Sequence, residues 1–382
     1  MYQYRSFHKK SVFAKIFQIT ARIFGLLLGG VFIFSGFVKA IDPLGFAYKI
    51  QDYLTAFGPL FERFSVLALP TSIALSSLEL IVGLLLFFNL FVKGASSLAL
   101  LFMCVMLPFT FYVAQTNPVT DCGCFGDAVI IDNWTTFYKN IVLTILAIVV
   151  FSYRKKFRSI LVKPVRRVLL VLFLSGSVGL SIYCYLYLPM IDFRPYKIGV
   201  NIAESKAIPK GEQGDVYETL LIYEKDGIQQ EFTIKNYPKD DSTWVFVDQK
   251  VNLISKGYEP PIHDFNIIDQ FGDDILDDIL VSYKKIYLLV MYDLNKASEK
   301  GAVGAENNYY KKALSENGSI FIALTGSGEN DIHDFRKKTG VSFPVYFCDP
   351  TVLKTIIRSN PGLLIIENKI ITAKIPWRKF NS

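Results

Sequence analysis

The chain has 382 residues, of which 51% are hydrophobic and 20% are charged, and it carries a formal net charge of +7. Its basic residues fall in short runs between apolar stretches, which is the positive-inside pattern of membrane proteins, so no nucleic-acid partner is predicted. The length allows two or three domains. The first half is strongly apolar, whereas residues from about 196 onward have an ordinary soluble composition.

Five apolar segments are close to the 20 or so residues that a membrane-spanning helix needs. They lie at residues 17–41, 68–90, 95–115, 135–153 and 168–188. The first is too long and too far from the N-terminus for a cleaved signal peptide. The sequence therefore predicts an all-α transmembrane bundle in a lipid bilayer, with the first segment retained.

The charges between these segments predict an orientation. The arm before residue 16 has four bases and the linker 154–167 has seven, and neither has an acid; these bases are Arg5, Lys9, Lys10, Lys15, Arg154, Lys155, Lys156, Arg158, Lys163, Arg166 and Arg167. The loop 116–134 has Asp121, Asp127 and Asp132 and no base. Basic loops stay cytoplasmic. We therefore expect a bacterial inner-membrane protein with a cytoplasmic N-terminus and a periplasmic C-terminal domain.

Glu79 lies near the middle of the second segment, in SSLELIVG. An ionisable group there is costly and usually marks a functional site or an internal pair. A neutral Glu79 hydrogen-bonded to a neighbouring helix is the alternative. Lys39, at the outer end of the first segment, is a candidate partner, although it could equally reach the lipid headgroups.

Cys122 and Cys124 flank Gly123 in VTDCGCFGDA (119–128), on the predicted oxidising side, where disulfides persist. Cysteines at i and i+2 can close a ring only if the backbone bends, and Gly123 permits the dihedral angles required. Such a bond departs from relaxed geometry, and strained disulfides are the labile or catalytic ones. A ring this small also adds little stability. The pattern favours redox chemistry at Cys122 and Cys124, with Gly123 as a supporting residue.

A structural clip on the loop remains an alternative for this pair. A zinc site is a weaker one, because none of the three histidines lies at a ligand spacing, so no metal is predicted. Cys104 and Cys184, inside predicted spans, are expected to be buried small hydrophobes. The four aspartates of GDDILDDIL (272–280) do not fit a calcium loop and predict a solvated turn or helix start.

Residues 17–153 resemble the DoxX/MauE group of four-helix membrane proteins. The resemblance rests on SGFVKAIDPLGFAYKIQDY (35–53), LELIVGLLL (78–86) and DCGCFGD (121–127), and the CxCFG element resembles the methylamine-utilisation MauE branch. That branch implies maturation of a disulfide-rich periplasmic protein. The bundle is also similar to the vitamin K epoxide reductase and DsbB type, which implies quinone as a cofactor. Quinone-linked relays generally use a second cysteine pair, whereas this face of the chain has only a single pair.

The chain is thus divided into a membrane domain (1–153), a basic linker with the fifth span (154–195), a β-rich linker region (196–257) and a C-terminal domain (258–382). In the β-rich region, two alternating runs around Asp226 and Gly227 predict a hairpin. After residue 258, strands and helices alternate, which predicts an α/β sheet covered by helices. The expected elements are strands at 284–294 and 319–326, helices at 307–317 and 329–340, and a hairpin at 362–375.

This C-terminal domain resembles the thioredoxin-like domains of the TlpA and peroxiredoxin kind. The similarity rests on PPIHDFNI (260–267), GVSFPVYFCDP (340–350) and NPGLLII (360–366). The active-site cysteines of that family would fall in DLNKAS (293–298), which has none, so the domain is expected to be redox-inactive with Cys348 buried. The resemblance implies that Asn360 and Pro361 contact extended polypeptide, as a client-binding loop.

Two functions follow as hypotheses. In the first, the protein supports periplasmic thiol–disulfide exchange or protein maturation as a candidate oxidoreductase. Cys122 and Cys124 then exchange electrons with protein clients, and Glu79 assists proton or quinone chemistry. In the second, the protein is a non-enzymatic scaffold whose thioredoxin-like domain docks a periplasmic partner complex. A transporter is a weaker third reading, because one buried acid offers little of a substrate path.

Overall fold

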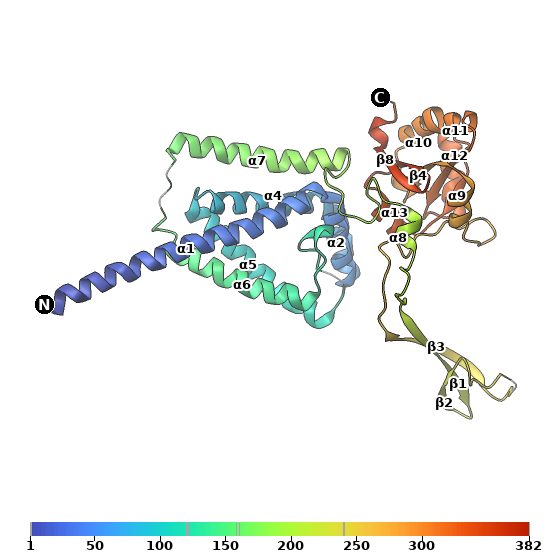
Figure 1. Ribbon diagram of the computed structural model, residues 1–382, viewed down its shortest axis with the longest axis horizontal. Helices are drawn as coiled ribbons and strands as arrows, with labels where there is room; N and C mark the ends of the chain where they lie inside the picture. Colours follow the sequence, from blue (N-terminus) through green and yellow to red (C-terminus); the bar gives the residue numbers. More distant parts are fainter. Residues whose placement is uncertain (1, 120–121, 158, 160, 240, 382) are drawn as a thin grey trace.

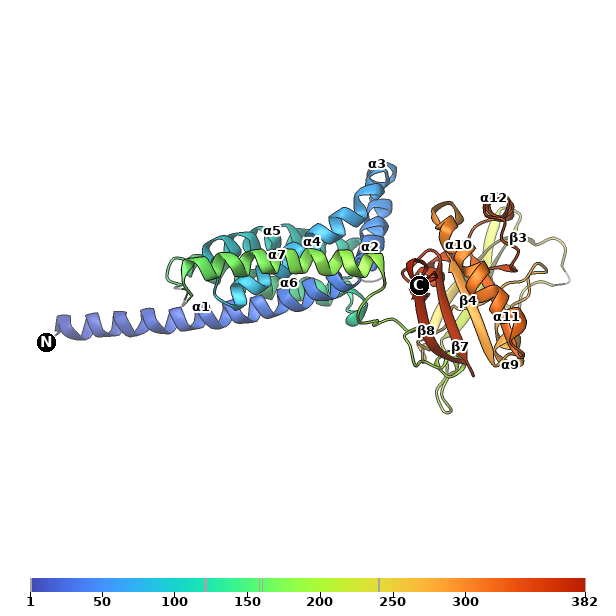
Figure 2. The same ribbon diagram turned by 90° about the horizontal axis from the view of Figure 1, so that it is seen from above.

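The computed structural model describes residues 2–119, 122–157, 159, 161–239 and 241–381. A helical bundle forms one end of an elongated molecule, and an α/β domain with a projecting three-stranded sheet forms the other (Figures 1 and 2). Asp121, Arg158 and the side chains of the four N-terminal bases, all used in the charge argument, lie outside the described part.

The apolar half is helical and spans a membrane. Its elements are α1 (Tyr2–Ile41), α2 (Pro43–Ala56), α3 (Pro59–Glu62), the 3-10 helices η1 (Arg63–Leu67) and η2 (Gly126–Ala128), α4 (Ala68–Phe87), α5 (Val92–Thr116), α6 (Asn133–Tyr153) and α7 (Lys163–Leu186). Five segments of the described chain are long and apolar enough to cross a membrane: Ile16–Ile41, Pro59–Phe87, Val92–Thr116, Asn133–Tyr153 and Lys163–Leu186. The five predicted spans are confirmed.

The segment 42–67, expected as a loop between spans, is instead helical. Asp42 caps α2 by accepting a hydrogen bond from the backbone N–H of Gly45 at 3.0 Å. Pro43 follows as the first helical residue, a position that proline favours. An apolar-run criterion misses α2 because that helix is not apolar throughout. It lies at the end of the bundle that faces the α/β domain (Figure 1).

The bundle is tightest where α1 crosses α4. A Cβ placed on Gly29 would lie 2.9 Å from the carbonyl oxygen of Gly83, so the two backbones touch there. Cys184 is buried on α7, as predicted. Cys104 on α5 is exposed on the protein surface, so its predicted burial is wrong. An apolar side chain in a span can face lipid at no cost, and composition alone does not say which face it occupies.

The C-terminal domain is built on a mixed five-stranded sheet in the order β6-β5-β4-β7-β8. Its strands are β4 (Lys285–Met291), β5 (Ser319–Thr325), β6 (Val345–Phe347), β7 (Gly362–Glu367) and β8 (Ile370–Pro376). The pairs β4–β5 and β5–β6 are parallel, whereas β7 runs antiparallel to both β4 and β8. This order and these directions confirm the α/β thioredoxin-like fold and the closing hairpin.

Helices cover both faces of this sheet. They are α8 (Ile202–Lys206), α9 (Leu276–Ser282), η3 (Leu294–Lys296), α10 (Glu299–Ala305), the π-helical turn η4 (Glu306–Tyr310), α11 (Lys311–Ser315), α12 (Glu329–Thr339), α13 (Pro350–Ile356) and η5 (Trp377–Lys379). Alternate residues of β4 enter two separate cores, one with α9 and α13 and one with α10 to α12. The aspartate-rich 272–280 segment contains the start of α9, as predicted.

A small antiparallel sheet projects from the C-terminal domain. It consists of β1 (Val216–Lys225), β2 (Ile228–Thr233) and β3 (Val245–Ser255), in the order β2-β1-β3. Asp226 and Gly227 join β1 to β2 with φ of 52° and 78°, which confirms the predicted hairpin. The arm leaves and rejoins the domain at one point, where the N–H of Tyr258 donates to the carbonyl of Gln213 at 2.8 Å.

Candidate functional site

The loop between α5 and α6 brings the two predicted cysteines together. The Sγ atoms of Cys122 and Cys124 lie 3.1 Å apart, and the side chains turn toward each other across Gly123. A disulfide bond measures about 2.05 Å, so this is a contact between two free thiols. Gly123 has a φ of +65°, in the left-handed region that favours glycine. Both cysteines are buried, with 6% and 7% of their surface exposed.

Hydrogen bonds from two other helices hold this loop. The hydroxyl of Ser35 on α1 donates to the carbonyl oxygen of Cys124 at 2.7 Å. The hydroxyl of Tyr53 on α2 donates to the carbonyl oxygen of Cys122 at 3.1 Å. A Cβ placed on Gly123 would lie 3.1 Å from the Lys49 side chain, which covers the glycine. The two sulfurs are therefore held in place by the bundle.

The two thiols differ in acidity. The hydrogen bond from Cys122 lowers the pKa of Cys124; burial opposes this, and the nearby Lys139 and Lys39 ammonium groups add to it. The same hydrogen bond, with burial, raises the pKa of Cys122. A dithiol that shares one proton in this way has one ready thiolate, and the thiolate is the nucleophilic form. Cys124 is the more acidic of the two thiols.

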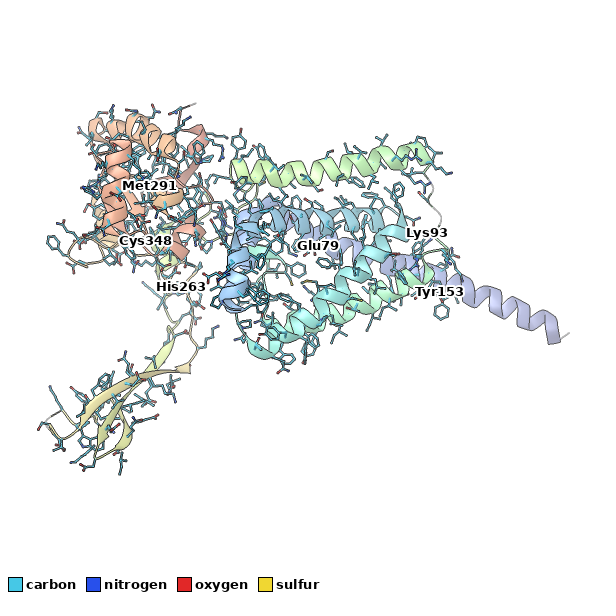
Figure 3. All side chains as sticks on the ribbon, turned by 180° about the vertical axis from the view of Figure 1, so that it is seen from behind. Glu79, Lys93, Tyr153, His263, Met291 and Cys348 are labelled. Atoms are coloured by element: carbon cyan, nitrogen blue, oxygen red, sulfur yellow. The ribbon has the colours of Figure 1, made fainter. Side chains whose placement is uncertain are left out.

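Lys39 and Glu79 form a buried ion pair inside the bundle. The Nζ of Lys39 donates to Oε2 of Glu79 at 2.7 Å, and the two residues are 5% and 6% exposed. Glu79 lies deep in the bundle, far from Cys348 in the C-terminal domain (Figure 3). The structure thus pairs Glu79 with Lys39, one of the two arrangements left open by the sequence, and brings both beside the cysteines.

An apolar cavity of about 440 Å³ lies against the cysteine pair. Its walls come from α2, α4 and α5, and they are aliphatic and aromatic side chains such as Leu75, Leu101 and Phe109. Lys39, Glu79, Cys122 and Cys124 supply its polar lining. A site with apolar walls and a few convergent polar groups is typical of a small-molecule site.

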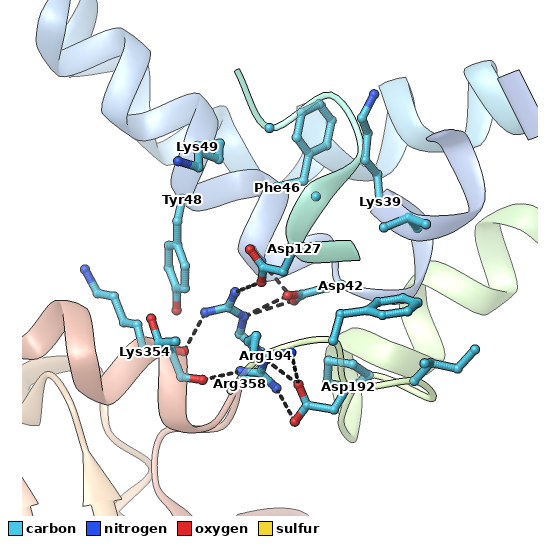
Figure 4. A pocket seen from close by; sticks show the side chains of 18 of the residues that line it. Lys39, Asp42, Phe46, Tyr48, Lys49, Asp127, Asp192, Arg194, Lys354 and Arg358 are labelled. Carbon is cyan, nitrogen blue, oxygen red and sulfur yellow. Dashed lines mark hydrogen bonds and ion pairs between the residues drawn. The ribbon is translucent and has the colours of Figure 1, made fainter. Parts of the chain in front are cut away.

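A second, polar cavity of about 250 Å³ reaches Gly123 from the side of the C-terminal domain. Three residues meet in its wall: Asp42, Asp127 and Arg358 (Figure 4). The guanidinium of Arg358 donates to the carboxylate of Asp42 at 3.0 Å and to that of Asp127 at 3.2 Å. Burial, the largest single effect, would raise the pKa of Asp42. The charges of Arg358 and Arg194, together with the hydrogen bonds from Gly45 and Arg358, outweigh burial and hold that pKa below its usual range.

The predicted client-binding loop faces the membrane domain. Asn360 and Pro361 are joined by a cis peptide bond, and the Asn360 amide donates to the carbonyl of Asp293 at 2.7 Å. Asn360 lines a cavity of about 730 Å³ between the C-terminal domain and α2, opposite Tyr48. The DLNKAS stretch (293–298) begins η3 and caps α10, and it supplies no thiol.

The single thiol of the C-terminal domain is buried in its core and is not accessible for reaction. Cys348 has no exposed surface and packs in the core with α9 and α13. Its pKa is raised to about 12, mainly by burial. Within the described ranges, no cluster of three or more histidine, cysteine or acidic side chains is placed to hold a metal.

The fold and site define an integral membrane protein in which a helical bundle carries a cysteine pair at the end that faces a thioredoxin-like domain. Residues 17–153 match the family described as methylamine utilisation protein MauE, so the membrane region is similar to that family. Residues 217–256, the projecting sheet, match a family described only as a domain of unknown function. No curated protein matches the chain.

Three solved structures are similar to parts of the chain. A candidate protein disulfide isomerase from Bacteroides thetaiotaomicron is 16% identical over 30% of this chain and 75% of its own, with a TM-score of 0.26. StoA from Bacillus subtilis is 13% identical over 31% and 96%, with a TM-score of 0.23. A thioredoxin-like protein from Bacteroides caccae is 9% identical over 81% and 77%, with a TM-score of 0.23.

The structure therefore gathers Cys122, Gly123, Cys124, Lys39 and Glu79 at one site, and places Asn360 and Pro361 at a separate one. Sequence reasoning did not single out Ser35, Tyr53, Asp42 or Arg358. The first three fall within SGFVKAIDPLGFAYKIQDY (35–53), whose dense polar pattern at the end of a span was an available signal. Arg358 precedes the predicted client-binding loop by two residues and left no comparable signal.

Proposed function

We propose that this chain is a membrane-bound thiol–disulfide exchange protein that acts on the periplasmic side through Cys122 and Cys124. The observation that carries the proposal is the 3.1 Å distance between the two sulfurs. At this distance the sulfur of Cys122 can displace a client sulfur bonded to Cys124 with almost no movement. The lowered pKa of Cys124 supports the same role, because a thiolate is needed for attack.

The exchange runs in two steps with balanced electrons. The Cys124 thiolate attacks one sulfur of a client disulfide; a Cys124–client bond forms and the client bond breaks, releasing a client thiolate. Cys122 then loses its proton and attacks Cys124, closing the Cys122–Cys124 bond and releasing the second client thiolate. The client gains two electrons and the pair loses two. Run backward, the same steps oxidise a client dithiol.

A membrane quinone, the cofactor implied by the resemblance, fits the apolar cavity by chemistry. Its ring would lie among Phe109 and the leucines, with Lys39 and the cysteines at the polar part of the lining. When bound, a quinone supplies a two-electron, two-proton acceptor. Lys39 and Glu79 share a proton in a hydrogen bond whose Nζ and Oε2 atoms lie 2.7 Å apart, beside the thiols that must lose theirs. Glu79 is thereby assigned to proton handling, and Lys39 to orienting it.

A second function is favoured by one observation: the thioredoxin-like domain has no exposed thiol. Its single cysteine is fully buried, so the domain supplies no thiol for exchange, and a binding role is proposed for it. In this reading the cysteine pair closes a structural clip and the domain docks a partner complex. A partner that co-purifies equally from oxidised, reduced and cysteine-free protein would support the scaffold and count against exchange.

Trapping of mixed disulfides distinguishes the exchange function from the scaffold function. Cys122→Ser removes the resolving thiol, so exchange with clients should halt at a mixed disulfide on Cys124, visible as reducible high-mass bands. Cys122→Ser/Cys124→Ser is the matched control and should give none. Absence of adducts from Cys122→Ser and from Cys124→Ser, in cells where the double variant has no phenotype, would contradict exchange.

A further inference from the structure

The C-terminal domain reaches the cysteine loop through one side chain. Arg358 follows α13 and is 7% exposed, yet it bonds to Asp42, 316 residues away, and to Asp127, 231 residues away. Asp127 lies three residues after Cys124, in η2. A guanidinium with two carboxylate partners forms charge-assisted hydrogen bonds, which are shorter and stronger than neutral ones.

These contacts lie on either side of the cysteines. Asp42 caps α2, the helix that carries Lys49 over Gly123 and Tyr53 against the Cys122 carbonyl. Asp127 begins the other flank of the loop, after Gly126, which has a φ of +52°. Arg358 therefore ties two elements to the C-terminal domain: the cysteine loop through Asp127, and the helix α2 that covers the loop through Asp42 (Figure 4).

The same guanidinium forms part of the wall of the polar cavity that leads to Gly123. The cavity is lined by α2 and η2 on one side and by Lys354, Thr355 and Arg358 on the other. Tyr48 lies against this cluster, with its ring 5.4 Å from the Arg358 guanidinium. Without Arg358, the half-buried carboxylate of Asp42 and the exposed carboxylate of Asp127 would lose the hydrogen-bond donor that they share, and α2 and the loop would be held together less tightly.

We propose that Arg358 is a positioning residue, supplied by the thioredoxin-like domain, that closes the approach to Cys122 and Cys124 from the soluble side. The domain has no exposed cysteine of its own and controls those of the membrane domain instead. This inference rests on the proposed exchange function for its purpose. Its geometry can be tested without any electron transfer, so the two can fail separately.

The test measures how fast a charged, membrane-impermeant maleimide alkylates the reduced pair in the full-length protein. Cys104 and Cys184 are replaced by alanine, and Cys348 is kept as an internal reporter, because its core position makes it react only if the C-terminal domain opens. Arg358→Ala should raise the alkylation rate about tenfold, since losing charge-assisted hydrogen bonds is worth at least one decade in an equilibrium. Arg358→Lys should restore part of the protection.

Two further variants keep the result decisive. Lys354→Ala removes a cation one turn earlier that lines the same cavity but makes no ion pair with the loop among the described residues; its rate should equal that of the unaltered protein. Asp127→Asn weakens the same contact from the membrane side and should raise the rate. If Arg358→Ala exposes Cys348, then Asp127→Asn decides the question. Rates within twofold of the unaltered protein, with Cys348 silent, would overturn the proposal.

Discussion

Removing one partner of the Lys39–Glu79 pair should destabilise the bundle strongly. The two charged atoms lie 2.7 Å apart and both residues are less than a tenth exposed. At an effective dielectric constant of about 20, this separation corresponds to an attraction of about 6 kcal/mol. Burial of both charges offsets much of that energy, and truncating one partner of such a pair typically costs about 3–5 kcal/mol. We expect Glu79→Ala to lose about that much.

The assay is a double-mutant cycle on detergent-solubilised protein, with denaturant unfolding followed by circular dichroism. Glu79→Leu and Lys39→Met should each be destabilising, whereas the double variant should recover most of the loss, because no charge is left unpaired. Ser77→Ala is the matched control: it is buried two residues before Glu79, and its Oγ makes no hydrogen bond with the described residues.

A loss below about 1 kcal/mol for Glu79→Ala, or a double variant as unstable as the sum of the single ones, would refute the electrostatic reasoning. The cycle also separates two roles of the pair. A folded double variant that still exchanges disulfides at the normal rate would make the pair purely structural. A folded double variant with slowed exchange would support the proton-handling role proposed for Glu79.

Three further predictions follow from the same contacts. Because the pKa of Cys124 is lowered, alkylation of the pair should rise with pH through a midpoint below the 8.5 or so of an ordinary thiol and be lost as pH falls through it; a midpoint at 8.5 or above would contradict the assignment. Tyr53→Phe should cost about 1 kcal/mol of stability by removing the bond to the Cys122 carbonyl, and should change the pair's alkylation rate, whereas Tyr138→Phe on the exposed surface of α6 should change neither. Deleting residues 216–255 should leave the C-terminal domain folded, because the arm leaves and returns where Gln213 and Tyr258 already bond; protease sensitivity of the β4–β8 sheet in that deletion would show that the arm is needed.

Local sequence patterns predict most of the fold. Apolar runs gave the five spans, and the alternation around Asp226 and Gly227 gave the hairpin. The cysteine spacing and Gly123 also predicted the meeting of the two sulfurs. In each case the signal lies within a few residues, where helix and strand periodicity or turn chemistry decides the conformation.

Such local patterns do not predict contacts between segments that are far apart in the sequence. The Arg358–Asp42 pair joins residues 316 positions apart, and neither residue type is unusual where it stands. The helix α2 is not an apolar run, so hydropathy alone does not predict it, although Asp42 and Pro43 form a cap and first-turn signal. The face of α5 that Cys104 occupies depends on how α5 packs, which a single sequence does not reveal.

The most direct test is a redox titration of Cys122 and Cys124 in native membranes, with the oxidised fraction read by thiol-specific mass tags against defined glutathione buffers. Reversible interconversion at a reduction potential between about −120 and −270 mV, the range of known exchange proteins, is what exchange requires. A potential below about −300 mV, or a pair that never changes state, would identify a structural clip and contradict the proposed function.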